Sequence, residues 1–205
     1  KLKSEGFEFE GSSYLFFEFV RLWKETNAKY FFLENVKMKK EWADIISKEL
    51  GVEPVKINSS LVCAQNRERY YWTNIPNITV PEDRHIMLSD VIDGAVSGVG
   101  TRGRKLKKDD LKYTNITNIR KDHKSNCIVT NAYGTGKYIT NDNEIKNLTV
   151  TEMELLQTFD EGYTDVGLSK TARIKLIGNS WTKEVIIHLF MGLITKKNKY
   201  NLFFR

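Results

Sequence analysis

The alternation of apolar and polar positions divides the first part of the chain into helices and strands. Over Ser12–Glu25 the apolar residues recur at helical spacing and place Leu15, Phe19 and Leu22 on one face, which predicts a helix packed on a sheet. The next run, "KYFFLEN" over residues 29–35, is apolar without alternation until its polar tip. Such a run is typical of a strand covered on both faces, as in a parallel α/β sheet.

The same pattern continues to about Pro76. A second helix, "KEWADIISKEL", is expected over 40–50 and should end at Gly51, since glycine readily adopts the left-handed conformation of a helix C-cap. Residues 53–60 and 69–75 are rich in strand-forming side chains and predict two more strands. Helix and strand alternate, so the fold class is α/β.

After Pro76 the periodic pattern weakens and then returns. Residues 77–146 contain six of the 13 glycines and short polar pieces without helical period, which indicates a small subdomain of strands and loops. Two capping boxes are possible near residue 150, Thr149 with Glu152 and Thr151 with Glu154. Further helices are expected over 169–177 and 182–197. We therefore expect three regions: 1–76, 77–146 and 147–205.

The composition indicates a globular protein. The 205 residues are 40% hydrophobic and 12% aromatic, which is enough to bury a core. No apolar stretch approaches the roughly 20 residues of a membrane span, and the two cysteines, Cys63 and Cys127, are too few for a disulfide framework. We expect a soluble, intracellular protein without a metal site.

The positive charge is concentrated in one place. Residues 97–140 contain ten basic and three acidic side chains, a local charge of +7, so the rest of the chain carries −1 of the net +6. Such a cluster fits either a solvated loop or a surface that contacts nucleic acid, and by itself it favours the solvated loop.

Two groups of polar residues stand out against the apolar pattern. Glu34 and Asn35 lie at the carboxyl end of a predicted strand, where open α/β sheets bind ligands. In "QNRER", Arg67 and Arg69 alternate, so both side chains can point to one face. An arginine could pair with the buried glutamate, or the arginines could hold a planar polar ligand. A plain structural ion pair remains an alternative.

Five segments resemble, in chain order, the later motifs of the cytosine-5 DNA methyltransferases: "LFFEFVRL", "YFFLENVKM", "INSSLVCAQNRERYYWTNIP", "LTVTEMELLQTF" and "LIGNSWTKEVIIHLF". The pieces "YYWTNIP", "GYTDV" and "VIIHLF" are most similar to the branch of the animal de novo enzymes and their phage and bacterial relatives. The resemblance implies part of a Rossmann-like, S-adenosylmethionine-dependent sheet. Residues 77–146 then stand where the family keeps its target-recognition region.

The resemblance also implies roles for single residues. In this family a cysteine thiolate adds to C6 of a flipped-out cytosine, and C5 then takes a methyl group from S-adenosylmethionine. Glu34 matches the glutamate that holds the N3/N4 edge of the base. Arg67 and Arg69 match the arginines that reach O2 and organise the pocket, and the sequence leaves open which of them contacts the base. Asn179 and Ser180 match the motif that closes over the cofactor.

The basic stretch is expected to contact the phosphates of duplex DNA. The residues expected in this role are Arg102, Arg104, Lys105, Lys107, Lys108, Arg120, Lys121 and Lys124.

The sequence departs from the family in one respect. The glycine-rich cofactor loop and the Pro-Cys nucleophile precede the first of the motifs above in relatives, and neither Cys63 nor Cys127 follows a proline. Three explanations are open: a fragment of an enzyme, one subunit of a split methyltransferase whose partner chain carries the missing motifs, or an inactive accessory module that binds DNA or an active methyltransferase. An RNA cytosine-5 methyltransferase is the rival activity. We expect location in the cytoplasm of a prokaryote or phage host, or in a eukaryotic nucleus, and the sequence does not distinguish restriction-modification from other roles.

Overall fold

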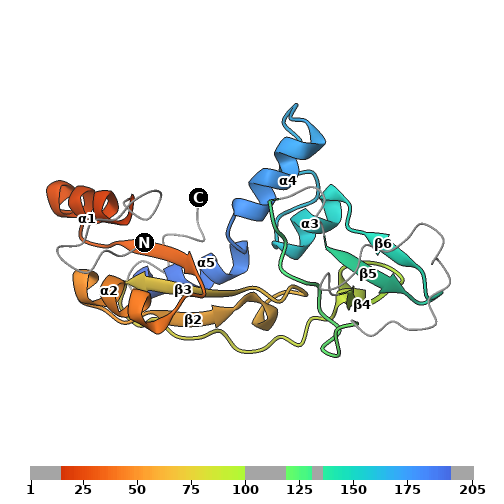
Figure 1. Ribbon diagram of the computed structural model, residues 1–205, viewed down its shortest axis with the longest axis horizontal. Coiled ribbons are helices and arrows are strands. Elements are labelled where there is room, and N and C mark those ends of the chain that lie inside the picture. Colours follow the sequence, from red (N-terminus) through yellow and green to blue (C-terminus); the bar gives the residue numbers. More distant parts are fainter. Residues whose placement is uncertain (1–14, 100–118, 131–135, 195–205) are drawn as a thin grey trace.

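Two small sheets organise the part of the chain that the computed structural model describes, namely residues 15–99, 119–130 and 136–194 (Figure 1). The first sheet and its helices are α1 (Leu15–Thr26), β1 (Phe32–Val36), α2 (Lys40–Leu50), β2 (Val55–Asn58), β3 (Glu68–Thr73) and α5 (Lys183–Phe190). The second sheet and its helices are β4 (Ala95–Val99), β5 (Lys137–Thr140), β6 (Ile145–Asn147), α3 (Val150–Leu156) and α4 (Lys170–Asn179).

The first sheet has the strand order β1-β3-β2, and β3 is antiparallel to both neighbours. The parallel pairing expected for residues 29–35 is therefore wrong for the described strands. The reason lies in the connections. Helix α2 carries the chain from β1 to β2, so these two strands run the same way, but the short connection over 59–67 turns β3 back between them.

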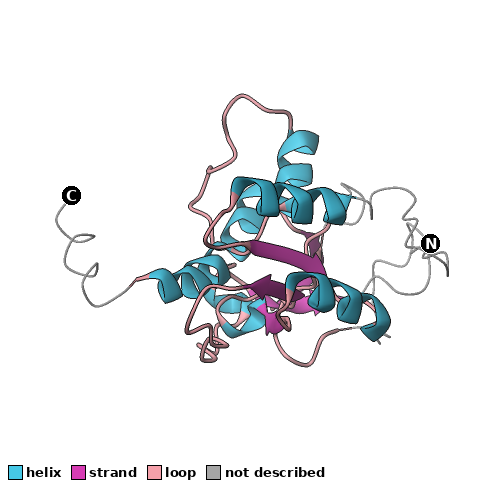
Figure 2. Cartoon of the chain, turned by 90° about the vertical axis from the view of Figure 1, so that its left-hand side faces the viewer, coloured by secondary structure: helices cyan, strands magenta, loops and turns pink. Residues whose placement is uncertain are grey.

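Helices cover both faces of this sheet, so the α/β class is retained (Figure 2). On one face Tyr70 and Trp72 of β3 pack with α1 and α2. On the other face Tyr71 packs with Val185 and Leu189 of α5. Adjacent residues of β3 thus serve different cores, as the alternation of a strand requires.

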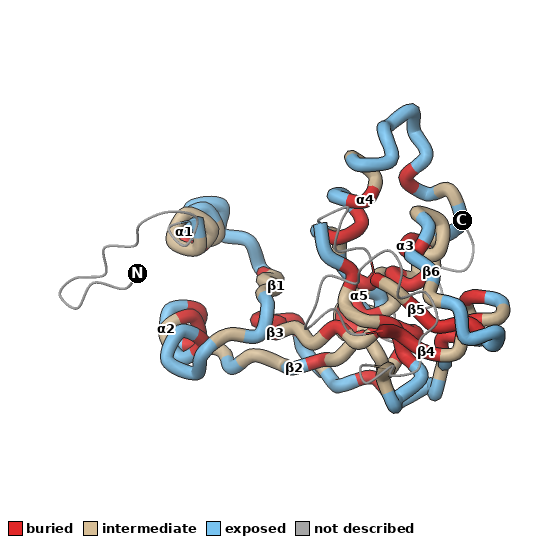
Figure 3. The backbone as a smooth tube through the Cα atoms, turned by 45° about the vertical axis from the view of Figure 1, so that its right-hand side comes forward, coloured by how far each residue is buried: buried red, intermediate tan, exposed pale blue. Residues whose placement is uncertain are grey.

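The second sheet packs with α3 and α4 around the largest hydrophobic core of the described residues. Leu88, Ile128, Met153, Leu156 and Ile177 are at most 1% exposed. Figure 3 places most of the buried backbone in this part of the molecule, whereas α1 contributes only Val20 to the buried set. The two parts of the molecule therefore differ in how firmly packing holds them. The division at residues 76 and 146 remains a prediction.

The residues on either side of the basic segment 100–118 are paired with each other. Val99 and Ile119 form an antiparallel bridge, and the amide of Arg120 donates to the carbonyl of Gly98 at 2.9 Å. Residues 100–118, which contain Arg102, Arg104, Lys105, Lys107 and Lys108, lie outside the described residues.

Helix ends follow the residues that the sequence provides for them. Gly51 ends α2 with φ = 70°, and its amide donates to the carbonyl of Ser47. Thr149 and Glu152 form the capping box of α3, so the first of the two predicted boxes is correct. Glu154 has a different role, because its carboxylate is buried and accepts the amides of Gly162 and Thr164.

Thr149→Ala should lower the free energy of unfolding by about 1 kcal/mol, because it removes the acceptor for the amide of Glu152. Thr151→Ala is the matched control. It removes a threonine inside the same helix and should leave the stability unchanged or slightly higher, since alanine is the better helix former. Urea denaturation of the two variants measures both effects, and equal losses at the two positions would contradict the assigned cap.

Candidate active site

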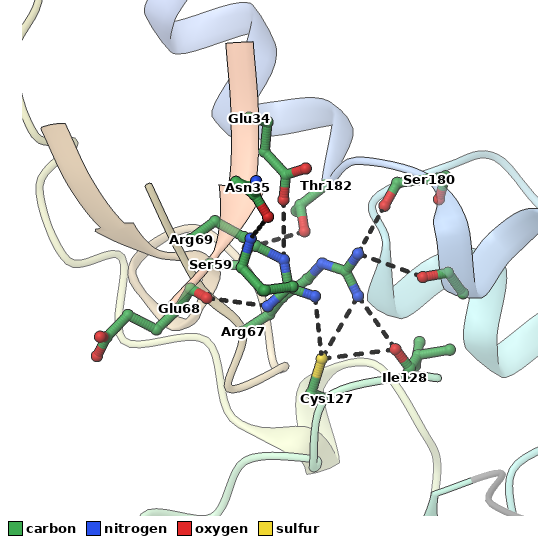
Figure 4. Close-up of polar contacts among 12 residues, drawn as sticks. Glu34, Asn35, Ser59, Arg67, Glu68, Arg69, Cys127, Ile128, Ser180 and Thr182 are labelled. Atoms are coloured by element: carbon green, nitrogen blue, oxygen red, sulfur yellow. Dashed lines mark hydrogen bonds and ion pairs between the residues drawn. The ribbon is translucent and has the colours of Figure 1, made fainter. Parts of the chain in front are cut away.

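Glu34 lies in the middle of β1 and projects from the same face of the sheet as Phe32. In the antiparallel register Glu34 is opposite Tyr71 and Val36 is opposite Arg69, so Glu34 and Arg69 are diagonal neighbours on one face. Arg69 Nε lies 2.8 Å from Glu34 Oε1, and the two side chains are 14% and 18% exposed. The predicted pairing of an arginine with the glutamate is present (Figure 4). The predicted position of Glu34 at the carboxyl end of the strand is wrong, because β1 continues to Val36.

The environment of Glu34 favours its protonated form more than water does. Burial raises the pKa of the Glu34 carboxyl, and this effect outweighs the opposing attraction of Arg69 and Arg67. The shortest contact of the ion pair is made by Oε1, and Oε2 accepts no hydrogen bond from the described residues. The carboxyl can therefore accept a hydrogen bond from a ligand or, when protonated, donate one.

Arg67 is buried, and backbone carbonyls surround its guanidinium. Nη1 donates to Ile128 O at 3.0 Å, while Nη2 donates to Ser180 O at 2.9 Å and Gly178 O at 3.3 Å. With an exposure of 4%, the side chain is closed to solvent. Arg67 thus joins the start of β3, the segment around Ile128 and the end of α4.

Arg69 is held differently and remains closer to the surface. Besides the ion pair with Glu34, Nη1 donates to Glu68 O at 2.9 Å, and Nη2 approaches Cys127 Sγ at 3.7 Å. Its contacts are thus to a carboxylate, one carbonyl and a weakly accepting sulfur. The structure distinguishes two residues that the sequence could not separate. Arg67 links backbone segments inside the protein, and Arg69 pairs with Glu34.

A buried polar network behind the arginines was not anticipated from the sequence. Gln65 Nε2 donates to Gln157 Oε1 at 3.2 Å, and the same oxygen accepts Thr182 Oγ1 at 2.8 Å. Thr182 Oγ1 also lies 2.8 Å from Ser59 Oγ. No buried side-chain nitrogen or oxygen lacks a hydrogen-bond partner in the described part of the chain. A glutamine at an otherwise apolar helix position was the only signal in the sequence.

The residues expected at the cofactor lie at the end of α4. Asn179 is exposed, whereas the Ser180 hydroxyl donates to Ile177 O at 2.7 Å and its carbonyl accepts from Arg67. Beyond them Trp181 and Phe190 pack edge-on against Phe32, with ring centroids 5.5 and 5.3 Å away. An aromatic surface therefore adjoins Glu34 on the same face of the sheet.

The described basic residues separate into different environments. Arg120 Nε donates to Asp122 at 2.9 Å, and Lys121 is exposed. Lys124 was expected at the phosphate-binding surface, but it is buried, and its ammonium donates to Ser60 O, Cys63 O and Ile86 O at 2.8, 3.3 and 2.5 Å. The expected contact of Lys124 with DNA phosphates is therefore wrong, because its ammonium is buried and bonded to three backbone carbonyls.

Two negative observations apply to the described residues. They contain no group of three histidine, cysteine, aspartate or glutamate side chains arranged to hold a metal ion. None of their helices has the length and apolar character needed to cross a membrane.

Comparison with known proteins supplies the context for this geometry. The family model for the C-5 cytosine-specific DNA methylase matches residues 3–90 and 89–194. Among solved structures, a DNMT2 mutant from Spodoptera frugiperda is 15% identical with a TM-score of 0.50, covering 93% of this chain and 76% of that one. A prophage-encoded E. coli protein described as a DNA modification methyltransferase is 19% identical with a TM-score of 0.55, covering 94% and 74%. At these identities the structural likeness shows the fold.

The different contacts of the two arginines predict different costs of replacement. Arg67→Lys should lower the free energy of unfolding by about 2 kcal/mol, because one ammonium cannot replace the planar donors that reach three carbonyls. Arg69→Lys should cost less than about 1 kcal/mol, since the ammonium can still pair with Glu34 near the surface. Denaturant titration of both variants is the measurement, and a larger loss for Arg69→Lys would contradict the linking role of Arg67.

Proposed function

Because the chain belongs to the C-5 cytosine-specific DNA methylase family, as its ordered motifs predicted, we propose that it forms the base-binding part of a DNA cytosine-5 methyltransferase. In this proposal a methyl group passes from S-adenosylmethionine to C5 of a cytosine flipped out of duplex DNA. The observation that carries the proposal is the pairing of Glu34 with Arg69, which places a protonatable carboxyl beside a guanidinium on one face of β1.

The two side chains match the polar edge of cytosine. When a thiolate adds to C6, electron density moves toward N3, and a carboxyl that donates a proton there stabilises the adduct. Glu34 suits this role for two reasons. Burial raises the pKa of its carboxyl, and Oε2 accepts no hydrogen bond from the described residues, so it can bind the base. We assign Arg69 to O2, because the guanidinium of Arg67 already donates to backbone carbonyls inside the protein. Glu34 and Arg69 then read adjacent positions of the same base.

The nucleophile must come from elsewhere in the assembled enzyme. Cys63 is 2% exposed, and burial raises the pKa of its thiol to about 11, so it is a poor nucleophile. Cys127 contacts both arginines at the edge where we place O2, away from C6. We propose that a Pro-Cys loop and a glycine-rich cofactor loop are supplied by a segment outside this sequence or by a separate chain.

The residues at the end of α4 fit the proposed cofactor. S-adenosylmethionine supplies an electrophilic methyl group on a sulfonium. Trp181 is 45% and Phe190 38% exposed, and such aromatic faces suit both a planar adenine ring and a neighbouring cation. Asn179 offers an exposed amide beside them. The rings pack against Phe32, which precedes Glu34 by two positions in β1, so a cofactor bound there would adjoin the base site.

The basic segment is proposed to hold the duplex. Its candidates are Arg102, Arg104, Lys105, Lys107, Lys108, Arg120 and Lys121, with Lys124 removed because its ammonium is internal. Arg120 pairs with Asp122, so we expect a smaller contribution from it than from the exposed Lys121. Location inside a cell, where both DNA and the methyl donor are found, follows from this proposal.

Glu34→Gln in the assembled methyltransferase should lower single-turnover methyl transfer by roughly a hundredfold and leave cofactor affinity unchanged. In the unsubstituted enzyme the protonated fraction of Glu34 rises as the pH falls toward its raised pKa, so the rate should rise on that side. The amide cannot titrate, so the variant should lose this dependence.

The control for that experiment is Glu184→Gln, which alters a surface carboxylate paired with Arg84 and should not change the rate. Tritiated methyl transfer to duplex DNA and to RNA is compared in parallel. Unchanged turnover for Glu34→Gln contradicts its assigned role. Transfer to RNA alone supports the RNA methyltransferase, and no transfer by the complete assembly supports an inactive accessory module.

Neutralising three lysines of the basic segment should weaken duplex binding and flatten its salt dependence. For Lys105→Gln, Lys107→Gln and Lys108→Gln combined, the slope of log affinity against log salt should fall by about 2.7 in magnitude if each contacts one phosphate. The control replaces three exposed lysines of the α1–α2 half: Lys24, Lys39 and Lys48. Fluorescence anisotropy from low to moderate salt measures both slopes, and equal changes would contradict a localised phosphate contact.

A further inference from the structure

Cys127 lies between the two arginines of the proposed base pocket. Its sulfur is 3.4 Å from Arg67 Nη1 and 3.7 Å from Arg69 Nη2, and its own S–H is directed to Ile128 O at 3.5 Å (Figure 4). The thiol thus donates to a carbonyl while its lone pairs face two guanidinium groups. Among the residues that the structure describes, it is the one side chain that accepts a hydrogen bond from both guanidinium groups.

The backbone around Cys127 is fixed to the segment that carries the arginines. Ser125 N donates to Ala64 O at 2.7 Å, and Asn66 N donates back to Ser125 O at 2.9 Å. One residue beyond Cys127, the amide of Ile128 donates to Gln65 Oε1 at 2.9 Å. These bonds hold the chain on both sides of Cys127, so the position of its sulfur is set by the fold rather than by the arginines.

The sulfur has unequal importance for the two guanidinium groups. Arg67 has three carbonyl acceptors, so its position does not depend on Cys127. Arg69 Nη2 makes no hydrogen bond other than that to the sulfur among the described residues. The other terminal nitrogen of Arg69, Nη1, is held separately by Glu68 O.

We infer that Cys127 is a positioning residue that keeps Arg69 Nη2 turned toward the base, an inference that rests on the proposed function. Thiol sulfur is a weak acceptor, so it orients the N–H yet yields it readily to a stronger acceptor such as O2 of cytosine. Without the sulfur, Nη2 is free to turn onto the carboxylate of Glu34 beside Nε, because guanidinium and carboxylate pair in a two-bond fork. The edge of Glu34 that the base requires would then be occupied.

The test compares Cys127→Ala with Cys127→Ser in the assembled methyltransferase. A duplex with 2-aminopurine next to the target cytosine reports by its fluorescence that the cytosine has left the stack, independently of methyl transfer. Cys127→Ala should lower the flipped-base signal about fivefold, the factor given by the loss of one ordinary hydrogen bond. Cys127→Ser restores an acceptor and should return the signal to within about twofold of the unsubstituted enzyme. Duplex affinity and the unfolding midpoint should stay unchanged in both.

Cys63→Ala controls for the loss of a thiol and should leave the flipped-base signal unchanged. The inference is overturned if Cys127→Ala flips the base as the unsubstituted enzyme does, or if its duplex affinity and unfolding midpoint fall together with the signal. If the unsubstituted assembly flips and methylates cytosine and Glu34→Gln impairs it while Cys127→Ala does not, only the role of Cys127 fails. If the unsubstituted assembly neither flips nor methylates, the proposed function fails as well.

Discussion

The buried guanidinium of Arg67 is the interaction on which the arrangement of this site depends. A cation inside a protein is stable only when acceptors replace its water shell, and Arg67 finds them in backbone carbonyls of two separate segments. Gly178 and Ser180 belong to the carboxyl end of α4, where the helix dipole adds negative potential. One side chain therefore fixes the start of β3, the end of α4 and the strand-like segment around Ile128, and the position of Arg69 two residues later follows from it.

The two sides of the site differ in how deeply their residues are buried. Arg67 and the network of Gln65, Gln157 and Thr182 are buried in or beside the largest hydrophobic core. Glu34 comes instead from β1, which pairs with β3 on one side and has no fully buried residue. Elements with fewer buried contacts open at lower free energy. We therefore expect the strand that carries Glu34 to open at a lower free energy than the segment that carries Arg67.

The sequence predicted the positions of the helices and strands better than it predicted how the strands pair. Gly51 and Thr149 end or begin helices through their own backbone and hydroxyl chemistry, so they could be identified from the sequence alone. The antiparallel insertion of β3 depends on where a short connection can lead, and no periodicity encodes that.

For the site too, the sequence identified residues that stand out locally but not the contacts that they make with distant parts of the chain. Glu34 and the arginine pair stood out because charged residues interrupt apolar runs. The separate roles of Arg67 and Arg69, the burial of Lys124 and the contact with Cys127 depend on residues roughly sixty positions away, which a single sequence does not connect.

The bridge between Val99 and Ile119 has a consequence for how such a protein can change. Because these two residues are adjacent in space, the closure entropy of the chain between them grows only slowly with its length. Segments of different length and sequence can therefore be exchanged between these two residues without rebuilding the core. Residues 124–128 lie outside that exchangeable unit, because they pair with the arginine segment. If the proposed function is correct, changes confined to residues 100–118 can alter DNA binding without altering the contacts of Glu34, Arg67 and Arg69.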